Sequence, residues 1–167
     1  MVYALLIDDD TQITQSASDL VRDQGLTLET ANSWDEGLEK FYALSPDLVI
    51  SDFNLPGSEM GLNLLLKISK LRPSVRLILL SAYLNEEDAD RIRELDLVHD
   101  VVRKISPVET ARRIIEEVRQ ASLRAGEPTD WKGFAAAAGR IQEVDEGALE
   151  ALDRYLRANR LPGARDE

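Results

Sequence analysis

The 167-residue sequence has no cysteine and only one histidine, His99. The absence of cysteine excludes disulfide bonds, a thiol nucleophile and a cysteine-ligated zinc site. A single histidine also argues against a metal site built on imidazole ligands, and we interpret His99 as a structural residue of the last predicted strand. A bound metal ion would therefore need oxygen ligands.

Long apolar segments and an excess of basic residues are also missing. The sequence begins with MVYALLIDDD, which is apolar only briefly before three aspartates, and no segment approaches the roughly 20 apolar residues of a membrane-spanning helix. Twenty Lys and Arg face 31 Asp and Glu, which gives a net charge of -11. Such a charge repels nucleic acids and anionic lipids. We expect a soluble, cytoplasmic protein that binds neither DNA nor a membrane.

Short apolar segments alternate with amphipathic segments from Val2 to about Arg124. This alternation predicts an α/β fold, in which a doubly wound, five-stranded parallel sheet carries helices on both faces. Most of the expected strands are rich in Val, Ile and Leu, as strands buried on both faces require. These strands are Tyr3 to Ile7, Leu26 to Thr30, Leu48 to Ser51, Arg76 to Leu80 and Val98 to Val102.

The pattern changes after Ala125. Residues 1–124 are expected to form one domain, 125–130 a linker, and 131–167 a small helical C-terminal extension. Apolar residues recur at helical spacing in two groups of the extension, namely Trp131, Phe134, Ala138 and Ile141, then Ala148, Leu149, Leu152, Tyr155 and Leu156. The extension is too short and too acidic for a DNA-binding domain. Its apolar stripes predict packing against the first domain or against a second copy of the chain.

Polar side chains follow the predicted strands at their carboxyl ends, where ligands of parallel α/β sheets bind. They are Asp8, Asp9 and Asp10 after the first strand, Asp52 after the third, Ser81 after the fourth, and Lys104 after the fifth. Clustered carboxylates repel one another unless a cation neutralises them, and Mg²⁺ prefers such oxygen ligands. A lysine and a hydroxyl beside them suit the oxygens of a phosphoryl group. The pattern favours phosphoryl transfer to a carboxylate, with Asp10 capping the first helix instead.

The ordered motifs LLIDDD, VISDFNLPG and LILLSA, followed by a lysine after the fifth strand, resemble the receiver domain of bacterial two-component response regulators. The resemblance covers residues 1 to about 124 and implies a CheY-like, flavodoxin-like sheet with strand order 2-1-3-4-5. It also implies that Asp52 accepts the phosphoryl group and that Ser81 and Lys104 hold its oxygens. The metal, Mg²⁺ or Mn²⁺, would be bound by Asp8, Asp9, Asp52 and the backbone carbonyl of Asn54.

The same resemblance implies a histidine kinase or a histidine phosphotransfer protein as the donor, and a downstream protein as the target. The chain would then be a signalling protein, not an enzyme, beyond its own phosphotransfer and dephosphorylation. A homodimer could form through the C-terminal helices, or through the face of the helices at 85–95 and near 107–124.

The chain departs from the usual receiver pattern in several places, among them Leu97, which replaces the usual small residue before the fifth strand. Most relatives have proline directly after the lysine, whereas Ile105 and Ser106 precede Pro107 here. Val101 replaces an aromatic residue that changes rotamer in many relatives, and the loop after Pro56 is one residue longer. Two alternatives therefore stay open: a pseudo-receiver that binds partners without phosphorylation, or a small Mg²⁺-dependent phosphatase. In the phosphatase, Asp8 would be the nucleophile, with Asp10 two residues on.

Overall fold

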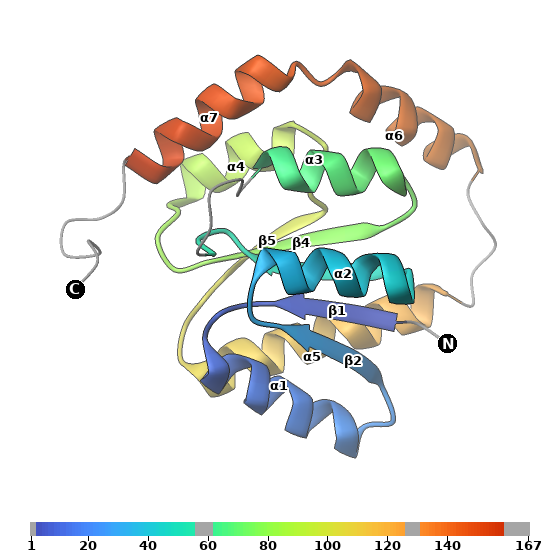
Figure 1. Cartoon of the computed structure of the whole chain (residues 1–167), viewed down its shortest axis with the longest axis vertical. Coiled ribbons are helices and arrows are strands. Elements are labelled where there is room, and N and C mark those ends of the chain that lie inside the picture. The colour runs from blue at the N-terminus through green and yellow to red at the C-terminus, as the bar shows by residue number, and fades with distance from the viewer. Residues whose placement is uncertain (1–2, 56–61, 126–130, 159–167) are drawn as a thin grey trace.

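The computed structural model describes residues 3–55, 62–125 and 131–158 (Figure 1). Five parallel strands form one sheet with the order β2-β1-β3-β4-β5. The order and the helices around the sheet confirm the predicted α/β fold. The strands are β1 (Tyr3–Ile7), β2 (Thr27–Ala31), β3 (Leu48–Asp52), β4 (Arg76–Ser81) and β5 (Asp100–Arg103).

Helices cover both faces of this sheet. The helices are α1 (Thr11–Asp23), α2 (Trp34–Leu44), α3 (Leu62–Leu71), α4 (Glu86–Glu94), α5 (Pro107–Arg124), α6 (Trp131–Glu143) and α7 (Glu146–Ala158). Successive strand residues point to opposite faces, so Leu5 joins the core under α2, α3 and α4, whereas Leu6 joins the core under α1 and α5. Figure 1 shows these two helical layers with the sheet between them. No helix of the described residues is long and apolar enough to cross a membrane.

Two strands begin later than the sequence predicts, for local reasons. Leu26 belongs to the turn that ends α1, because Gly25 has a positive φ of 67° and the Leu26 N–H donates to the Val21 carbonyl. The predicted start of β5 at Val98 is two residues early. The reason is His99, whose Nδ1 accepts a hydrogen bond of 3.0 Å from the Leu77 N–H, so the regular ladder begins only at Asp100.

His99 has the structural role that the sequence predicts. Burial, and then the neighbouring charge of Arg76, lower the pKa of this imidazole. A neutral ring can accept a hydrogen bond at one nitrogen, as Nδ1 does from Leu77. His99 therefore fastens the start of β5 to β4, away from the carboxyl ends of the strands.

The C-terminal helices α6 and α7 pack over α3 and α4 of the same chain (Figure 1). Ile141, Leu149 and Leu156 are buried in the same apolar core as the residues of α3. The Leu62 N–H donates to Asp153 Oδ1 at 3.1 Å, and Lys70 Nζ lies 2.7 Å from Glu146 Oε1. The chain thus adopts the first of the two predicted arrangements. Of the linker predicted at 125–130, residues 126–130 lie outside the described residues. So does the predicted longer loop after Pro56.

Candidate functional site

Three carboxylates meet at the carboxyl ends of β1 and β3. These two strands are neighbours, and Ile7 pairs with Ser51, so the residues that follow, Asp8 and Asp52, come to lie side by side. One carboxylate oxygen from each of Asp8, Asp9 and Asp52 lies within 4.8 Å of the others. Asp8 and Asp52 are buried, whereas Asp9 is exposed. The predicted acidic cluster is therefore present, with one side open to solvent.

Asp8 is the most deeply buried member of the cluster. Its Oδ1 accepts a hydrogen bond of 2.9 Å from the Asp10 N–H, and its Oδ2 lies 2.8 Å from the Lys104 ammonium. Burial, followed by the charge of Asp52, raises the pKa of Asp8 to about 6, although Lys104 opposes this shift. Within the described part of the chain, Oδ2 is paired with the Lys104 ammonium and has no other polar partner. This oxygen suits a cation.

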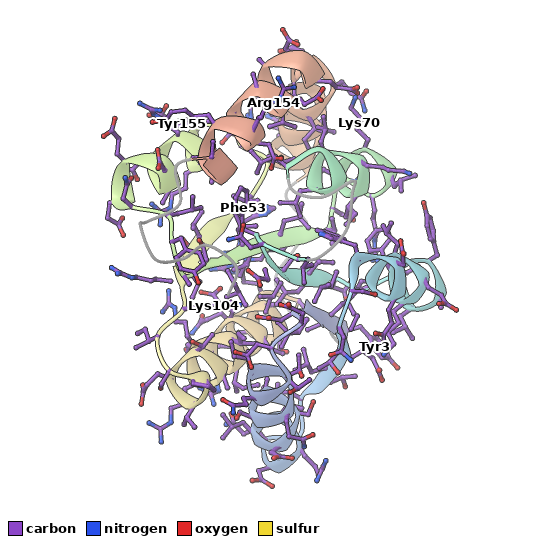
Figure 2. The ribbon with its side chains drawn as sticks, turned by 60° about the vertical axis from the view of Figure 1, so that its left-hand side comes forward. Tyr3, Phe53, Lys70, Lys104, Arg154 and Tyr155 are labelled. Carbon is purple, nitrogen blue, oxygen red and sulfur yellow. The ribbon has the colours of Figure 1, made fainter. Side chains whose placement is uncertain are left out.

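Lys104 brings a positive charge to the cluster. Its ammonium lies 3.0 Å from Asp52 Oδ2 as well as 2.8 Å from Asp8 Oδ2, and its side chain is only 13% exposed. Burial acts to lower the pKa of Lys104, but the charge of Asp52 and the contacts with Asp8 outweigh burial and raise it. Lys104 is therefore a fixed cation at neutral pH. Figure 2 shows it at the ends of the strands, near α5.

Asp52 occupies the end of β3 and is held at both carboxylate oxygens. Oδ1 accepts a hydrogen bond of 3.2 Å from the Asn54 N–H, while Oδ2 faces Lys104. The next residue, Phe53, is buried in the apolar core on the side of α3 and α7 (Figure 2). The predicted contribution of the Asn54 carbonyl to metal binding stays a prediction.

Ser81 ends β4, one residue beyond Leu80, which pairs with Asp52. The side chain is buried, and its Oγ accepts hydrogen bonds from the N–H groups of Tyr83 and Leu84 at 3.2 and 3.1 Å. A hydroxyl oxygen can accept twice and still donate its own hydrogen. Ser81 therefore holds the start of the β4–α4 loop in place at the strand end next to Asp52.

Asp10 caps a helix, as the sequence predicts. Its Oδ1 accepts hydrogen bonds from the N–H groups of Gln12 and Ile13 at the start of α1. Asp10 is also absent from the set of carboxylates that could share a cation within the described residues. The three aspartates after β1 thus have different roles. Asp8 and Asp9 belong to the carboxylate cluster, whereas Asp10 caps α1.

Thr110 lies beside the segment that carries Lys104 and is not among the site residues predicted from the sequence. Its Oγ1 accepts a hydrogen bond of 3.0 Å from the Ile105 N–H. A signal for it existed in the sequence, because any residue other than proline after Lys104 has an N–H that needs an acceptor. The identity of the acceptor depends on the path of the backbone into α5.

The donor set of the cluster fits a hard divalent cation. Mg²⁺ is bound in proteins through one or two carboxylates, waters and phosphate oxygens, without nitrogen or sulfur ligands. Asp8, Asp9 and Asp52 offer carboxylate oxygens only, and the buried Oδ2 of Asp8 already faces one positive charge, the Lys104 ammonium. Three carboxylates beside one ammonium also leave an excess of negative charge, which a cation would offset.

Sequence similarity to known proteins extends over most of this chain. The chain is 25% identical over 162 residues to the uncharacterized transcriptional regulatory protein YesN of Bacillus subtilis, covering 93% of this chain and 41% of that protein. It is 27% identical over 173 residues to the nitrate/nitrite response regulator protein NarL of Escherichia coli, covering 94% of this chain and 79% of that protein. The chain thus spans less than half of YesN, and 53% of the transcriptional regulatory protein DltR of Streptococcus agalactiae.

Solved structures and a family model also show similarity to response regulators. A response regulator receiver domain protein (CheY-like) from Methanospirillum hungatei is 27% identical, with a TM-score of 0.59 over 74% of this chain and 98% of that chain. NtrX from Brucella abortus is also 27% identical, with a TM-score of 0.60 over 75% of this chain and 28% of that one. The family described as the response regulator receiver domain matches residues 4–116. The chain therefore belongs to the response regulator receiver domain family, as its sequence motifs predict.

Proposed function

We propose that this receiver domain accepts a phosphoryl group on Asp52 and passes the signal on through contacts with another protein. The observation that carries the proposal is the position of Asp52, whose Oδ2 lies 3.0 Å from Lys104 within a cluster of three carboxylates. A carboxylate in this setting is a nucleophile with a fixed cation beside it. Asp8 and Asp9 are the neighbours expected of a cation-dependent phosphoryl transfer.

In the transfer, an oxygen of Asp52 forms a bond to phosphorus while the bond from phosphorus to a donor imidazole nitrogen breaks. The electron pair leaves with the imidazole, which takes up a proton. The Lys104 ammonium stays charged and stabilises the phosphoryl oxygens, and Ser81 offers its hydroxyl at the neighbouring strand end. A bound Mg²⁺ or Mn²⁺, held by Asp8, Asp9, Asp52 and the Asn54 carbonyl, would neutralise charge on the transferring group.

The donor we propose is a histidine kinase or a histidine phosphotransfer protein, because a receiver of a two-component system takes its phosphoryl group from such a histidine. The phosphorylated form would shift the population of the loops that carry Ser81 and Lys104. Ile141 of α6 and Leu149 and Leu156 of α7 are buried in the same apolar core as residues of α3 and α4. A homodimer or a target is therefore more readily bound by the face of α4, β5 and α5.

The test is phosphorylation in solution. The chain is incubated with acetyl phosphate and Mg²⁺, and its intact mass is followed over time beside a receiver known to react. We expect the wild type to gain the mass of one phosphoryl group and Asp52→Asn to gain none. Asp23→Asn, which removes an exposed carboxylate at the end of α1, should react like the wild type. An unmodified wild-type mass, while the known receiver reacts, would contradict the proposal and favour a pseudo-receiver.

The position of Asp10 argues against the phosphatase alternative. A phosphatase with Asp8 as its nucleophile would use the carboxylate two residues on as an acid or base, whereas Asp10 is engaged in capping α1. Repeated turnover of p-nitrophenyl phosphate, abolished by Asp10→Asn, would nevertheless restore this alternative.

A further inference from the structure

The segment after Lys104 lacks the proline that the family usually has there. The residue in its place therefore has a backbone N–H that needs a hydrogen-bond acceptor. Ile105 has a backbone N–H, which a proline lacks. Ile105 is 76% exposed, so the packing of its side chain can do little to fix the segment. If the backbone near Lys104 is held in place, the hold must come from its hydrogen bonds.

Thr110 supplies one of these hydrogen bonds. Its Oγ1 accepts from the Ile105 N–H at 3.0 Å, and the Thr110 residue is only 1% exposed. Thr110 is itself fixed in the first turns of α5, because its N–H donates to the Ser106 carbonyl at 2.9 Å. The Ser106 carbonyl, at the cap of α5, and the Ile105 N–H are therefore both bound by one buried residue, the first by its backbone N–H and the second by its side chain.

The other side of Lys104 is tied to the sheet. The Lys104 N–H donates to the Ser81 carbonyl at 2.9 Å, at the end of the β4–β5 pairing. The backbone of Lys104 and Ile105 is thus held by β4 on one side and by α5 on the other. From this position the ammonium reaches Asp8 and Asp52 at 2.8 and 3.0 Å.

We propose that Thr110 is a positioning residue, which holds the Lys104 ammonium at the site through the Ile105 N–H. This role rests on the proposed function of Lys104 in phosphoryl transfer. A proline at position 105 would have no N–H to donate to Thr110, so this hydrogen bond requires a residue other than proline there. Catalytic groups must be held close to their productive positions, and small displacements lower rates strongly.

The first test compares phosphorylation rates with acetyl phosphate and Mg²⁺. Thr110→Val keeps the shape of the side chain but removes the acceptor, and we expect a rate about tenfold lower. Thr110→Ser keeps the hydroxyl and should restore a rate near that of the wild type. Thr14→Val is the matched control, because Thr14 is a buried threonine of the neighbouring helix α1 whose hydroxyl donates to the Thr11 carbonyl of the same helix. It should leave the rate unchanged.

A double-mutant cycle separates positioning from general damage. In a Lys104→Met background, Thr110→Val should cause no further loss of rate, because the group that it positions is absent. A loss of the same size in both backgrounds, or a wild-type rate for Thr110→Val, would overturn the proposal. If Thr110→Val does not fold, Thr110→Ala removes the same acceptor with less bulk and is expected to behave identically.

A second readout needs no phosphoryl donor. Brief labelling with acetic anhydride followed by peptide mass spectrometry measures how accessible each lysine amine is. We expect Thr110→Val to raise the labelling of Lys104 several-fold while the exposed Lys67 is labelled as before. Unchanged Lys104 labelling would refute the positioning role even if phosphorylation of the wild type succeeds. A wild type that fails to react with acetyl phosphate would refute the proposed function, and labelling would still decide the role of Thr110.

Discussion

Replacing Asp8 by asparagine should stabilise the fold at neutral pH, although it removes a residue of the site. The pKa of Asp8 is raised from its ordinary value of 3.8 to about 6, first by burial and second by the charge of Asp52. An acid whose pKa is higher in the folded state binds its proton more tightly there than in the unfolded chain. Its ionised form therefore opposes folding, and this cost develops as the pH rises from about 4 to about 6.

The size of the effect follows from the pKa values. At about 1.4 kcal/mol for each tenfold change in proton affinity, ionised Asp8 costs about 3 kcal/mol at pH 7.5. At pH 5 the folded-state Asp8 is mostly protonated, and the remaining cost is about half as large. Asparagine resembles the neutral acid in shape and carries no charge. We therefore expect Asp8→Asn to raise the free energy of unfolding by up to about 3 kcal/mol at pH 7.5, and by about half of that at pH 5.

The assay is urea unfolding, followed by circular dichroism, in buffer with EDTA so that no divalent cation contributes. Asp9→Asn is the matched control, because Asp9 belongs to the same cluster but is exposed to water. Its free energy of unfolding should stay within about 0.5 kcal/mol of the wild type. An Asp8→Asn protein that is less stable than the wild type at pH 7.5, or a gain that does not shrink at pH 5, would refute this reasoning.

The remaining predictions concern the C-terminal helices and two glycines. Leu149→Ala in α7 removes a side chain that is 1% exposed, and should lower the free energy of unfolding by about 2–5 kcal/mol in urea titrations. Leu123→Ala, at a residue 65% exposed in α5, should change it by less than about 0.5 kcal/mol, and equal effects of the two would contradict packing of α7 on the domain. Gly37→Ala should lower the thermal midpoint, because the new Cβ would lie 2.6 Å from Ile7 Cδ1, whereas Gly139→Ala in α6 has open space around it and should raise the midpoint slightly.

Most of the fold could be predicted because each level of the sequence points the same way. Apolar strands followed by polar residues define a parallel sheet and place its ligands at one edge. Asp8 and Asp52 lie close together, as expected, because the strand order makes β1 and β3 neighbours and their pairing aligns Ile7 with Ser51. Caps such as Ser33, whose Oγ accepts from the Glu36 N–H, are local and could be read directly.

Features that depend on tertiary contacts could not be predicted. The start of β5 moved because a side chain, His99, takes up a backbone N–H of β4, and no strand propensity encodes this choice. Thr110 went unnoticed because its partner, the Ile105 N–H, is selected by the backbone path between β5 and α5. The apolar stripes of α6 and α7 predict only that one face of each helix is buried. They could not tell whether the covering surface belongs to the same chain.

The raised pKa of Asp8 and the function of the site have one physical origin. Buried carboxylates beside a single ammonium make the folded state less stable than a neutral cluster would, and they persist because the rest of the core compensates. The same excess of negative charge creates affinity for a divalent cation, which would remove the repulsion between Asp8 and Asp52. Cation binding should therefore stabilise the wild type and leave Asp8→Asn almost unaffected. A site whose charges were already balanced without a cation would have little affinity for one.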